Sequence, residues 1–291
     1  MDSSKIYDQV REHYSSASRT TSVKYGEAVA KSFGYSADEL ANIPEDANLG
    51  LSCGNPLAIA SLKEAIIDLG SGAGFDVFLA AGKVGPSGRA IGVDMNEDML
   101  TRAHRIQSTQ PTPTPHITFL HANITSVPLP AATADCIISN CVINLVPPAD
   151  KPAVFREMYR LLKPGGRVAV SDILAKRPLP ERLVRDVAMY VGCVAGASEV
   201  REYEGWLEGV GFGEVMIVDT GADLNVYLET GEDGERKGSC CTPGTGTGRD
   251  GAGTVPAAST GSGGAVPAGA VPEKTDLNEY VGSYKIFAVK N

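Results

Sequence analysis

Residues 65–74 read Ala-Ile-Ile-Asp-Leu-Gly-Ser-Gly-Ala-Gly, and they indicate the fold class of this 291-residue chain. A short apolar run bounded by turn residues is typical of a buried strand. The alternate glycines that follow it allow a sharp turn and a close approach of the backbone to a ligand. A helical pattern continues from Phe75 to Lys83. This order predicts one strand–turn–helix unit of a parallel α/β sheet, with a ligand site at the turn.

The same alternation of apolar runs and helical patterns continues along the chain. We predict strands at residues 65–69, 89–93, 117–120, 135–139, 167–171, 214–218 and 284–289. We predict helices at residues 75–83, 97–107, 151–162 and 199–210. Residues 4–42 look helical, and Ser36 with Glu39 fits a capping box. The expected fold is a Rossmann-like, seven-stranded and mostly parallel α/β sheet after an N-terminal helical segment.

One stretch differs in composition from the rest. Residues 238–273 hold ten Gly and four Pro, and such a segment buries too little apolar surface to offset its ordering entropy. We expect a flexible linker there, carrying Cys240 and Cys241. The expected divisions are an N-terminal segment at 1–62, an α/β domain at 63–237, the linker, and a strand at 274–291 that returns to the sheet.

An acidic residue ends the second predicted strand. Asp94 lies 20 residues after Gly74, where a carboxylate can accept hydrogen bonds from both ribose hydroxyls of a nucleoside. A dinucleotide fingerprint would need a glycine where this chain has Phe75, and Asp68 would repel a pyrophosphate but suits ammonium and sulfonium cations. The spacing Asp68-x-Gly70-x-Gly72-x-Gly74 resembles the first motif of class I methyltransferases. That resemblance implies S-adenosylmethionine as the cofactor; a dehydrogenase, or a turn that serves packing only, are the alternatives.

The fold class locates the remaining cofactor contacts, because ligands of open α/β sheets bind beyond the carboxyl ends of the strands. We expect Met95 against one adenine face, Asn123 and Ile124 at the adenine edge, and Asn140 at the methionine moiety. Met95 and Ile124 could equally be core residues. The predicted cofactor set is Asp68, Gly70, Ser71, Gly72, Gly74, Asp94, Met95, Asn123, Ile124 and Asn140.

Three segments outside the glycine turn resemble the arsenite methyltransferases. They are residues 48–56 (NLGLSCGNP), 139–145 (SNCVINL) and 190–197 (YVGCVAGA), within a similarity that runs from about residue 6 to 220 and resumes at the last strand. The resemblance implies methyl transfer from S-adenosylmethionine to arsenite, and then to methylarsenite, while cysteine thiolates hold the arsenic. It implies Cys53 and Cys193 as ligands, with Cys241 or Cys240 as a mobile third.

Chemistry supports thiol ligands, because trivalent arsenic is a soft acceptor. Cys136 and Cys141 lie in or beside a buried strand, and we predict packing roles for both. Cys240 and Cys241 lie where packing does not explain them, so a mobile ligand and a spare exposed thiol both remain open. With no export signal and no Cys-x-x-Cys pair, all six cysteines are expected to be reduced. The reaction needs no general base, and we expect surface or packing roles for the four histidines, His13, His104, His116 and His121.

Charge limits the partners. The chain has 26 Lys plus Arg against 35 Asp plus Glu, a net charge of −9, which argues against nucleic acid and anionic membranes. No apolar run reaches the roughly 18 residues of a membrane span, and a cytoplasmic location is expected. A thiol reductant of the glutathione or thioredoxin type should regenerate the cysteines. The alternatives are a class I methyltransferase acting on carbon, oxygen or nitrogen, and a non-catalytic thiol protein that senses or sequesters a metalloid.

Overall fold

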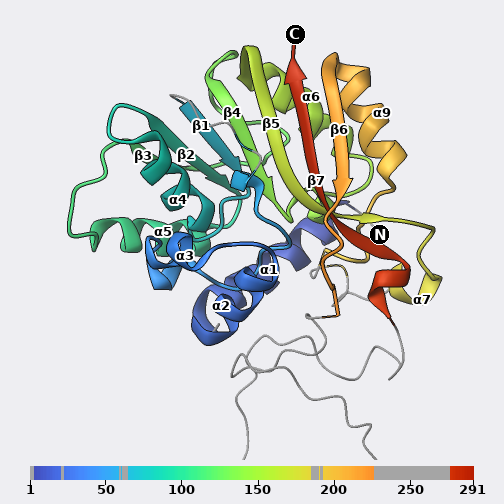
Figure 1. Cartoon of the computed structure of the whole chain (residues 1–291), viewed down its shortest axis with the longest axis horizontal. Helices are drawn as coiled ribbons and strands as arrows, with labels where there is room; N and C mark the ends of the chain where they lie inside the picture. The colour runs from blue at the N-terminus through green and yellow to red at the C-terminus, as the bar shows by residue number, and fades with distance from the viewer. Residues whose placement is uncertain are drawn as a thin grey trace, which may run out of the picture.

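The computed structural model describes residues 3–20, 23–58, 60, 65–184, 190, 193–225 and 276–291. Within them lies one seven-stranded sheet in the order β3-β2-β1-β4-β5-β7-β6 (Figure 1). Its strands are β1 (Ala65–Leu69), β2 (Arg89–Asp94), β3 (Ile117–His121), β4 (Ala134–Asn140), β5 (Leu162–Ala175), β6 (Phe212–Asp219) and β7 (Val281–Lys290). Strands β1 to β5 pair in parallel, whereas β7 runs antiparallel to both of its neighbours, β5 and β6. The predicted seven-stranded, mostly parallel sheet is confirmed.

The start of β5 differs from the prediction. The helix before it ends at Leu161 and the strand begins at Leu162, so residues 163–166 lie within the strand. The register shows why the sequence favours a turn there: Ala134 pairs with Leu162, but Cys136 pairs with Arg167. The Pro-Gly-Gly stretch is therefore accommodated as an irregularity in the ladder between β4 and β5.

The helices follow the predicted pattern. Those of the α/β part are α4 (Phe75–Val84), α5 (Glu97–Ser108), α6 (Lys151–Leu161), α7 (Glu181–Val184) and α9 (Val200–Val210), and the 3₁₀ turns are η1 (Glu45–Ala47), η2 (Pro56–Ala58), η3 (Ile143–Leu145) and η4 (Leu277–Glu279). The N-terminal segment forms α1 (Ser3–Thr20), α2 (Val23–Ser32) and α3 (Ala37–Ala41). The capping box is confirmed: the Ser36 hydroxyl accepts a hydrogen bond from the Glu39 N–H, and the Glu39 carboxylate accepts one from the Ser36 N–H.

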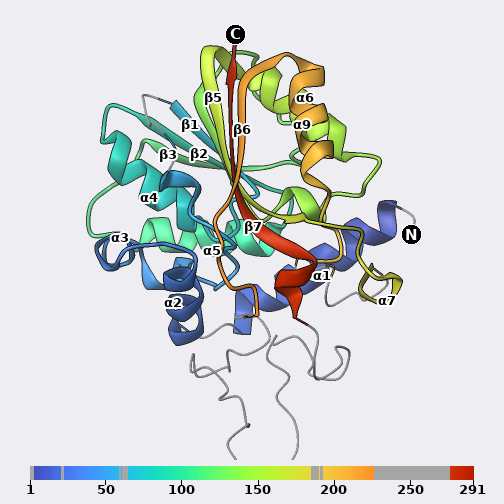
Figure 2. The ribbon, with the colours of Figure 1, turned by 45° about the vertical axis from the view of Figure 1, so that its right-hand side comes forward.

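Alternate residues of β1 point to opposite faces of the sheet and enter two different cores. Ile66 packs with Phe78 of α4 and Met99 of α5 on one face, while Ile67 packs with Phe155 of α6 on the other. Figures 1 and 2 show α1 and α2 near the carboxyl ends of the parallel strands, where the fold locates a ligand site. No helix in the described part of the chain is long and apolar enough to cross a bilayer.

Strand β7 returns to the sheet as predicted and lies between β5 and β6. The predicted linker at 238–273, with Cys240 and Cys241, lies outside the described residues.

Candidate active site

The turn between β1 and α4 has the backbone conformation that its glycines predict. Gly70, Gly72 and Gly74 have φ angles of 80°, 52° and 92°, a region that residues with a side chain rarely adopt. Apart from its chain neighbours, a Cβ on Gly72 would come within 4 Å of one atom in the described part of the chain, the Met99 sulfur at 3.9 Å. The backbone at Gly72 therefore faces open space, as close approach to a ligand requires.

Asp94, at the end of β2, is fixed against this turn. Its carboxylate accepts hydrogen bonds from the N–H of Gly72 and the N–H of Asn96, each with an oxygen–nitrogen distance of 2.8 Å. Burial raises the pKa of Asp94, and these backbone donors counteract the effect. The carboxylate thus links the end of β2 to the backbone of the glycine turn.

A cavity of about 970 Å³, including the part open to solvent, lies above the turn. Nine of the ten predicted cofactor residues line it: Asp68, Gly70, Ser71, Gly72, Asp94, Met95, Asn123, Ile124 and Asn140. Ile124 lines the cavity and is also buried in a hydrophobic core, and its contact with adenine stays a prediction. Gly74 differs, because it does not line the cavity and a Cβ there would collide with Phe119 and Phe78. The role of Gly74 is to let α4 start close to these two rings.

The buried charges of the cavity are acidic. Asp68, Asp76 and Asp94 all line it and are all buried or half-buried, whereas the cationic lining residue Arg11 is exposed. Burial raises the pKa of Asp68, and the nearby charges of Asp76 and Asp94 raise it further. The hydroxyl of Ser71, also in the lining, is buried without a hydrogen-bond partner among the described residues. Clustered carboxylates and an unpaired hydroxyl fit a polar ligand that carries positive charge.

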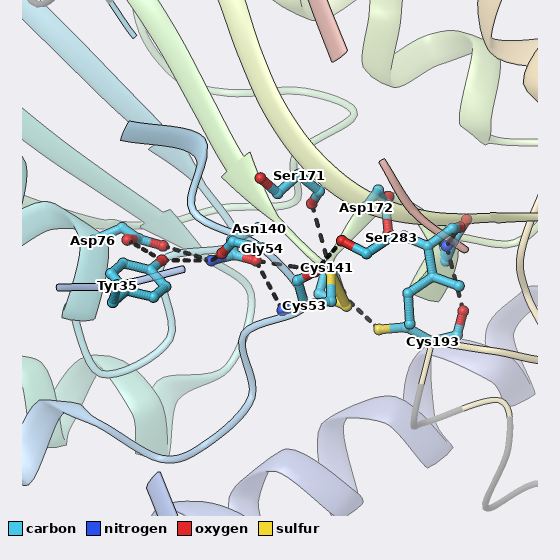
Figure 3. The surroundings of a disulfide bond; sticks show 12 residues. Tyr35, Cys53, Gly54, Asp76, Asn140, Cys141, Ser171, Asp172, Cys193 and Ser283 are labelled. Carbon is cyan, nitrogen blue, oxygen red and sulfur yellow. Dashed lines mark hydrogen bonds between the residues drawn. A yellow bond between two sulfur atoms is a disulfide. The ribbon is translucent and has the colours of Figure 1, made fainter. Parts of the chain in front are cut away.

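Asn140, at the end of β4, connects this cavity with the loop that carries Cys53 (Figure 3). On the cavity side its amide nitrogen lies 2.9 Å from Asp76 Oδ2 and 2.9 Å from the Tyr35 hydroxyl. On the other side the same nitrogen donates to the Gly54 carbonyl at 2.9 Å, and the amide oxygen accepts from the Cys53 N–H at 3.2 Å. One side chain therefore fixes the position of both regions.

Tyr35 and Asp76 were missed by the sequence analysis. The Tyr35 hydroxyl donates to Asp76 Oδ1 at 2.7 Å. Asp76 stands in the first turn of α4, where an acidic residue is explained by the helix dipole alone. Burial raises the pKa of Asp76 to about 6, with the bonds from Asn140 and Tyr35 acting in the opposite direction. The sequence feature that could have identified Asp76 as a site residue is its position just beyond the glycine turn.

Three cysteine sulfurs meet near the end of β4. Cys53 and Cys141 form a disulfide, and the Cys193 thiol donates to the Cys141 carbonyl with 2.7 Å between sulfur and oxygen. Figure 3 shows the Cys193 sulfur pointing toward that disulfide. Cys141 and Cys193 both have positive φ angles, of 61° and 65°. Such backbone is uncommon outside glycine and is concentrated at functional sites.

One prediction about the cysteines is wrong. Cys141 is buried in a hydrophobic cluster, as a packing role predicts, but its sulfur also lies against Cys53, because the 48–56 loop crosses the carboxyl end of β4. The cysteines were expected to be reduced, and the structure holds this pair as a disulfide. Cys136, by contrast, is fully buried inside β4, as a packing thiol should be. The third thiol beside Cys53 and Cys193 is thus Cys141, which immediately follows the predicted cofactor residue Asn140.

A carboxylate lies beside the thiols. An oxygen of Asp172 in β5 and the sulfurs of Cys53 and Cys141 all lie within 4.8 Å of one another. Burial raises the pKa of Asp172 to about 6, while the Tyr203 hydroxyl, 2.7 Å away, lowers it. Burial also raises the pKa of the Cys193 thiol, and a hydrogen bond from Tyr14 acts against that effect.

The other predicted residues lie elsewhere. Cys240 and Cys241 are outside the described residues, so their roles stay predictions. None of the four histidines is among the residues that line the cavity. His104, for example, packs edge-on against Phe119, in agreement with a packing role.

Comparison with known proteins is consistent with this geometry. The family model described as "Methyltransferase domain" matches residues 61–211. An arsenite methyltransferase of Halobacterium salinarum is 41% identical over 67% of this chain and 52% of its own length, and one of Mus musculus is 30% identical over 72% and 59%. The chain therefore spans between half and three fifths of these relatives.

The crystal structure of an arsenic(III) S-adenosylmethionine methyltransferase from Chlamydomonas reinhardtii has a similar fold. It superimposes with a TM-score of 0.53 at 23% identity, over 90% of this chain and 73% of that one. The family match covers the glycine turn, Asp94, Asn140 and Cys141. On that match, the chain belongs to the methyltransferase-domain family.

Proposed function

We propose that this protein transfers methyl groups from S-adenosylmethionine to trivalent arsenic bound by cysteine thiolates. The observation that carries the proposal is Asn140, which hydrogen-bonds both Asp76 in the acidic cavity and Cys53 in the thiol cluster. A donor in the cavity and an acceptor on the thiols would thus be neighbours. The similarity to arsenite methyltransferases supports the same acceptor.

The cavity fits the cofactor on its own chemistry. When bound, S-adenosylmethionine supplies a methyl carbon attached to a sulfonium sulfur, which leaves with the bonding electron pair. Asp94 would accept hydrogen bonds from the ribose hydroxyls, as predicted. Asp68 and Asp76 would favour the positive charges, because unlike charges attract strongly in a site shielded from water. Gly72 leaves room for the backbone to approach the ligand.

Cys53, Cys141 and Cys193 would hold the arsenic once the disulfide is reduced. Arsenite has three hydroxyl groups, and exchange with three thiols forms three As–S bonds and releases three water molecules. All three side chains are buried, which excludes water from the bound arsenic. Soft sulfur ligands favour such a soft centre. The arsenic lone pair then forms the new bond to the methyl carbon, so the chain's task is positioning.

The disulfide has a place in this chemistry. Methyl transfer raises the formal oxidation state of arsenic by two. The As–S bonds to Cys53 and Cys141 would then break as the two sulfurs join in a disulfide, which returns two electrons to arsenic, and water or an external thiol would take the vacated position with loss of a proton. Cys53 and Cys141 are already close enough to form that bond. A thiol reductant of the glutathione or thioredoxin type would then reduce the pair again. Such reductants are present in the cytoplasm, the location that we propose for the protein.

One experiment separates this function from the alternatives. The reduced protein is incubated with arsenite, S-adenosylmethionine labelled in its methyl group and excess thiol, and the arsenic species are separated. We expect labelled methylarsenicals. Cofactor consumption with no labelled arsenic would indicate a carbon, oxygen or nitrogen acceptor. Arsenite binding without any cofactor binding would indicate a sensing or sequestering protein.

A further inference from the structure

A buried lysine lies behind the thiol cluster and has no part in the chemistry above. Lys151, the first residue of α6, is 1% exposed, and lysines are rarely buried to this extent without partners. Its ammonium donates to the Gly196 carbonyl at 2.5 Å, to the Ser198 hydroxyl at 2.8 Å and to the Asn144 side-chain oxygen at 3.4 Å. The three donors of an ammonium thus have three acceptors.

Two of these acceptors belong to the segment that carries Cys193. Residues 193–198 lie directly on η3, since a Cβ added to Gly196 would collide with the Asn144 carbonyl. The Asn144 amide nitrogen lies 2.5 Å from the Ile173 carbonyl oxygen, 2.9 Å from Asp172 Oδ1 and 3.3 Å from the Cys193 carbonyl oxygen, so its two hydrogens are shared among these three acceptors. The lysine therefore fixes the segment directly at its far end, and through Asn144 at Cys193 itself.

The backbone at Cys193 needs such support. Its φ of 65° is unfavourable for a residue with a side chain, and such conformations persist only where the surroundings enforce them. Packing alone would not require an ammonium, because well-packed apolar residues commonly replace buried ion pairs at no cost in stability. What an apolar side chain of the same length could not do is bind the Gly196 carbonyl and the Ser198 hydroxyl.

We propose that Lys151 is a positioning residue for Cys193. The lysine anchors residues 193–198 so that the Cys193 sulfur points at Cys53 and Cys141. The role of this anchor in arsenic binding rests on the proposed function, but its effect on the position of Cys193 can be tested without arsenic. Burial lowers the pKa of Lys151 to about 8, and the negative charge of Asp172 acts against that shift and so favours the protonated lysine.

The test compares Lys151→Met with Lys290→Met. Lys290 is a matched control, since its ammonium also donates to two carbonyls, those of Tyr159 and Leu162, at 2.7 and 2.9 Å. Three quantities are measured on the reduced proteins: the alkylation rate of Cys193 relative to Cys136 by mass spectrometry, the dissociation constant for arsenite, and that for S-adenosylmethionine.

For Lys151→Met we expect Cys193 to be alkylated about tenfold faster, because release of the segment exposes its sulfur and this outweighs the loss of the lysine charge that lowers the pKa of the thiol. We expect arsenite to bind about tenfold more weakly, as for loss of a charge-assisted hydrogen bond. Cofactor affinity, Cys136 and every property of Lys290→Met should stay unchanged. An unaltered Cys193 alkylation rate would overturn the proposal, as would an equal loss of both affinities together with faster alkylation of Cys136.

Ser198→Ala is a milder variant that keeps the test available if Lys151→Met does not fold. It removes one acceptor of the ammonium, and a smaller change in the same direction is expected; no change would count against the anchor. The alkylation rate does not depend on arsenic. If the wild-type protein fails to bind arsenite, the proposed function fails, while the alkylation result still decides the positioning role.

Discussion

The side-chain oxygen of Asn140 accepts a hydrogen bond from the backbone N–H of Cys53, across 87 residues of sequence, with 3.2 Å between oxygen and nitrogen. The bond joins the end of β4 to the 48–56 loop. Because the amide nitrogen of the same side chain binds Asp76 in the cavity, it couples the position of one thiol to the cofactor region.

Asn140→Ala should therefore slow methyl transfer more than it weakens binding. Misplacement of reacting groups by about 1 Å can cost roughly 100-fold in rate. We expect a loss of that order in the single-turnover rate, measured by rapid quench with both substrates saturating. Asn42→Ala is the control, because the Asn42 side chain is exposed, donates to the carbonyl of Asp38 and does not line the cavity. An unchanged rate in Asn140→Ala would remove this side chain from the mechanism.

Asp94→Ala should weaken S-adenosylmethionine binding and leave arsenite binding intact. In the proposed site the substitution would remove two charge-assisted hydrogen bonds to the ribose, each worth about 1.5–3 kcal/mol. Calorimetry on the reduced protein gives both dissociation constants. If the cofactor bound Asp94→Ala as tightly as the wild type, the ribose would have to lie elsewhere.

Serine replacement should distinguish the three clustered thiols from the packing thiol. Cys53→Ser, Cys141→Ser and Cys193→Ser should each lose most arsenite affinity, because a serine hydroxyl is a hard oxygen with a far higher pKa. Cys136→Ser is the control and should keep it. X-ray absorption at the arsenic edge should count three sulfur ligands in the wild type and two in any residual complex of Cys141→Ser.

The tail pair provides a second comparison. With three thiolates supplied by Cys53, Cys141 and Cys193, the double change Cys240→Ser and Cys241→Ser should leave arsenite affinity intact. If the third ligand lay in the tail, as the resemblance implies, the double change would instead slow arsenite methylation strongly and leave monomethylarsenite methylation largely intact. That pattern would transfer the third ligand from Cys141 to the tail.

The pKa of Asp76 gives a pH dependence with a defined sign. Folding raises this pKa from 3.8 to about 6, which means that the folded state favours the protonated carboxyl. The contribution of Asp76 to the free energy of unfolding is therefore complete below about pH 4 and is lost as the pH rises through 6. A cationic ligand binds the ionised form, so its affinity should fall below pH 6 by up to about tenfold per pH unit. Asp76→Asn should lack this component. The measurement is the dissociation constant for S-adenosylmethionine between pH 5 and 8. The same pH dependence in wild type and variant would contradict this role of Asp76.

The parts predicted from the sequence are those set by local pattern. The glycine turn, Asp94 and the strand ends follow from residues that are adjacent along the chain, and the cavity lining then follows from the fold class. Cys141 was missed for a physical reason: its neighbours in sequence form a buried strand, while its sulfur meets a loop 88 residues away. The polar groups Tyr35 and Lys151 were missed because partners of each also lie far along the chain: Asp76 is 41 residues from Tyr35, and Gly196 is 45 residues from Lys151. Only tertiary packing brings such groups together.

The central claim is that methyl passes from the cavity to arsenic on Cys53, Cys141 and Cys193. The most direct test is a single turnover: reduced protein, freed of excess thiol, is loaded with one equivalent of arsenite and mixed with methyl-labelled S-adenosylmethionine. The account predicts one labelled methyl group on arsenic for each protein molecule, together with a Cys53–Cys141 disulfide found by peptide mapping. Arsenic that stays bound but unlabelled while the cofactor occupies its cavity would contradict it.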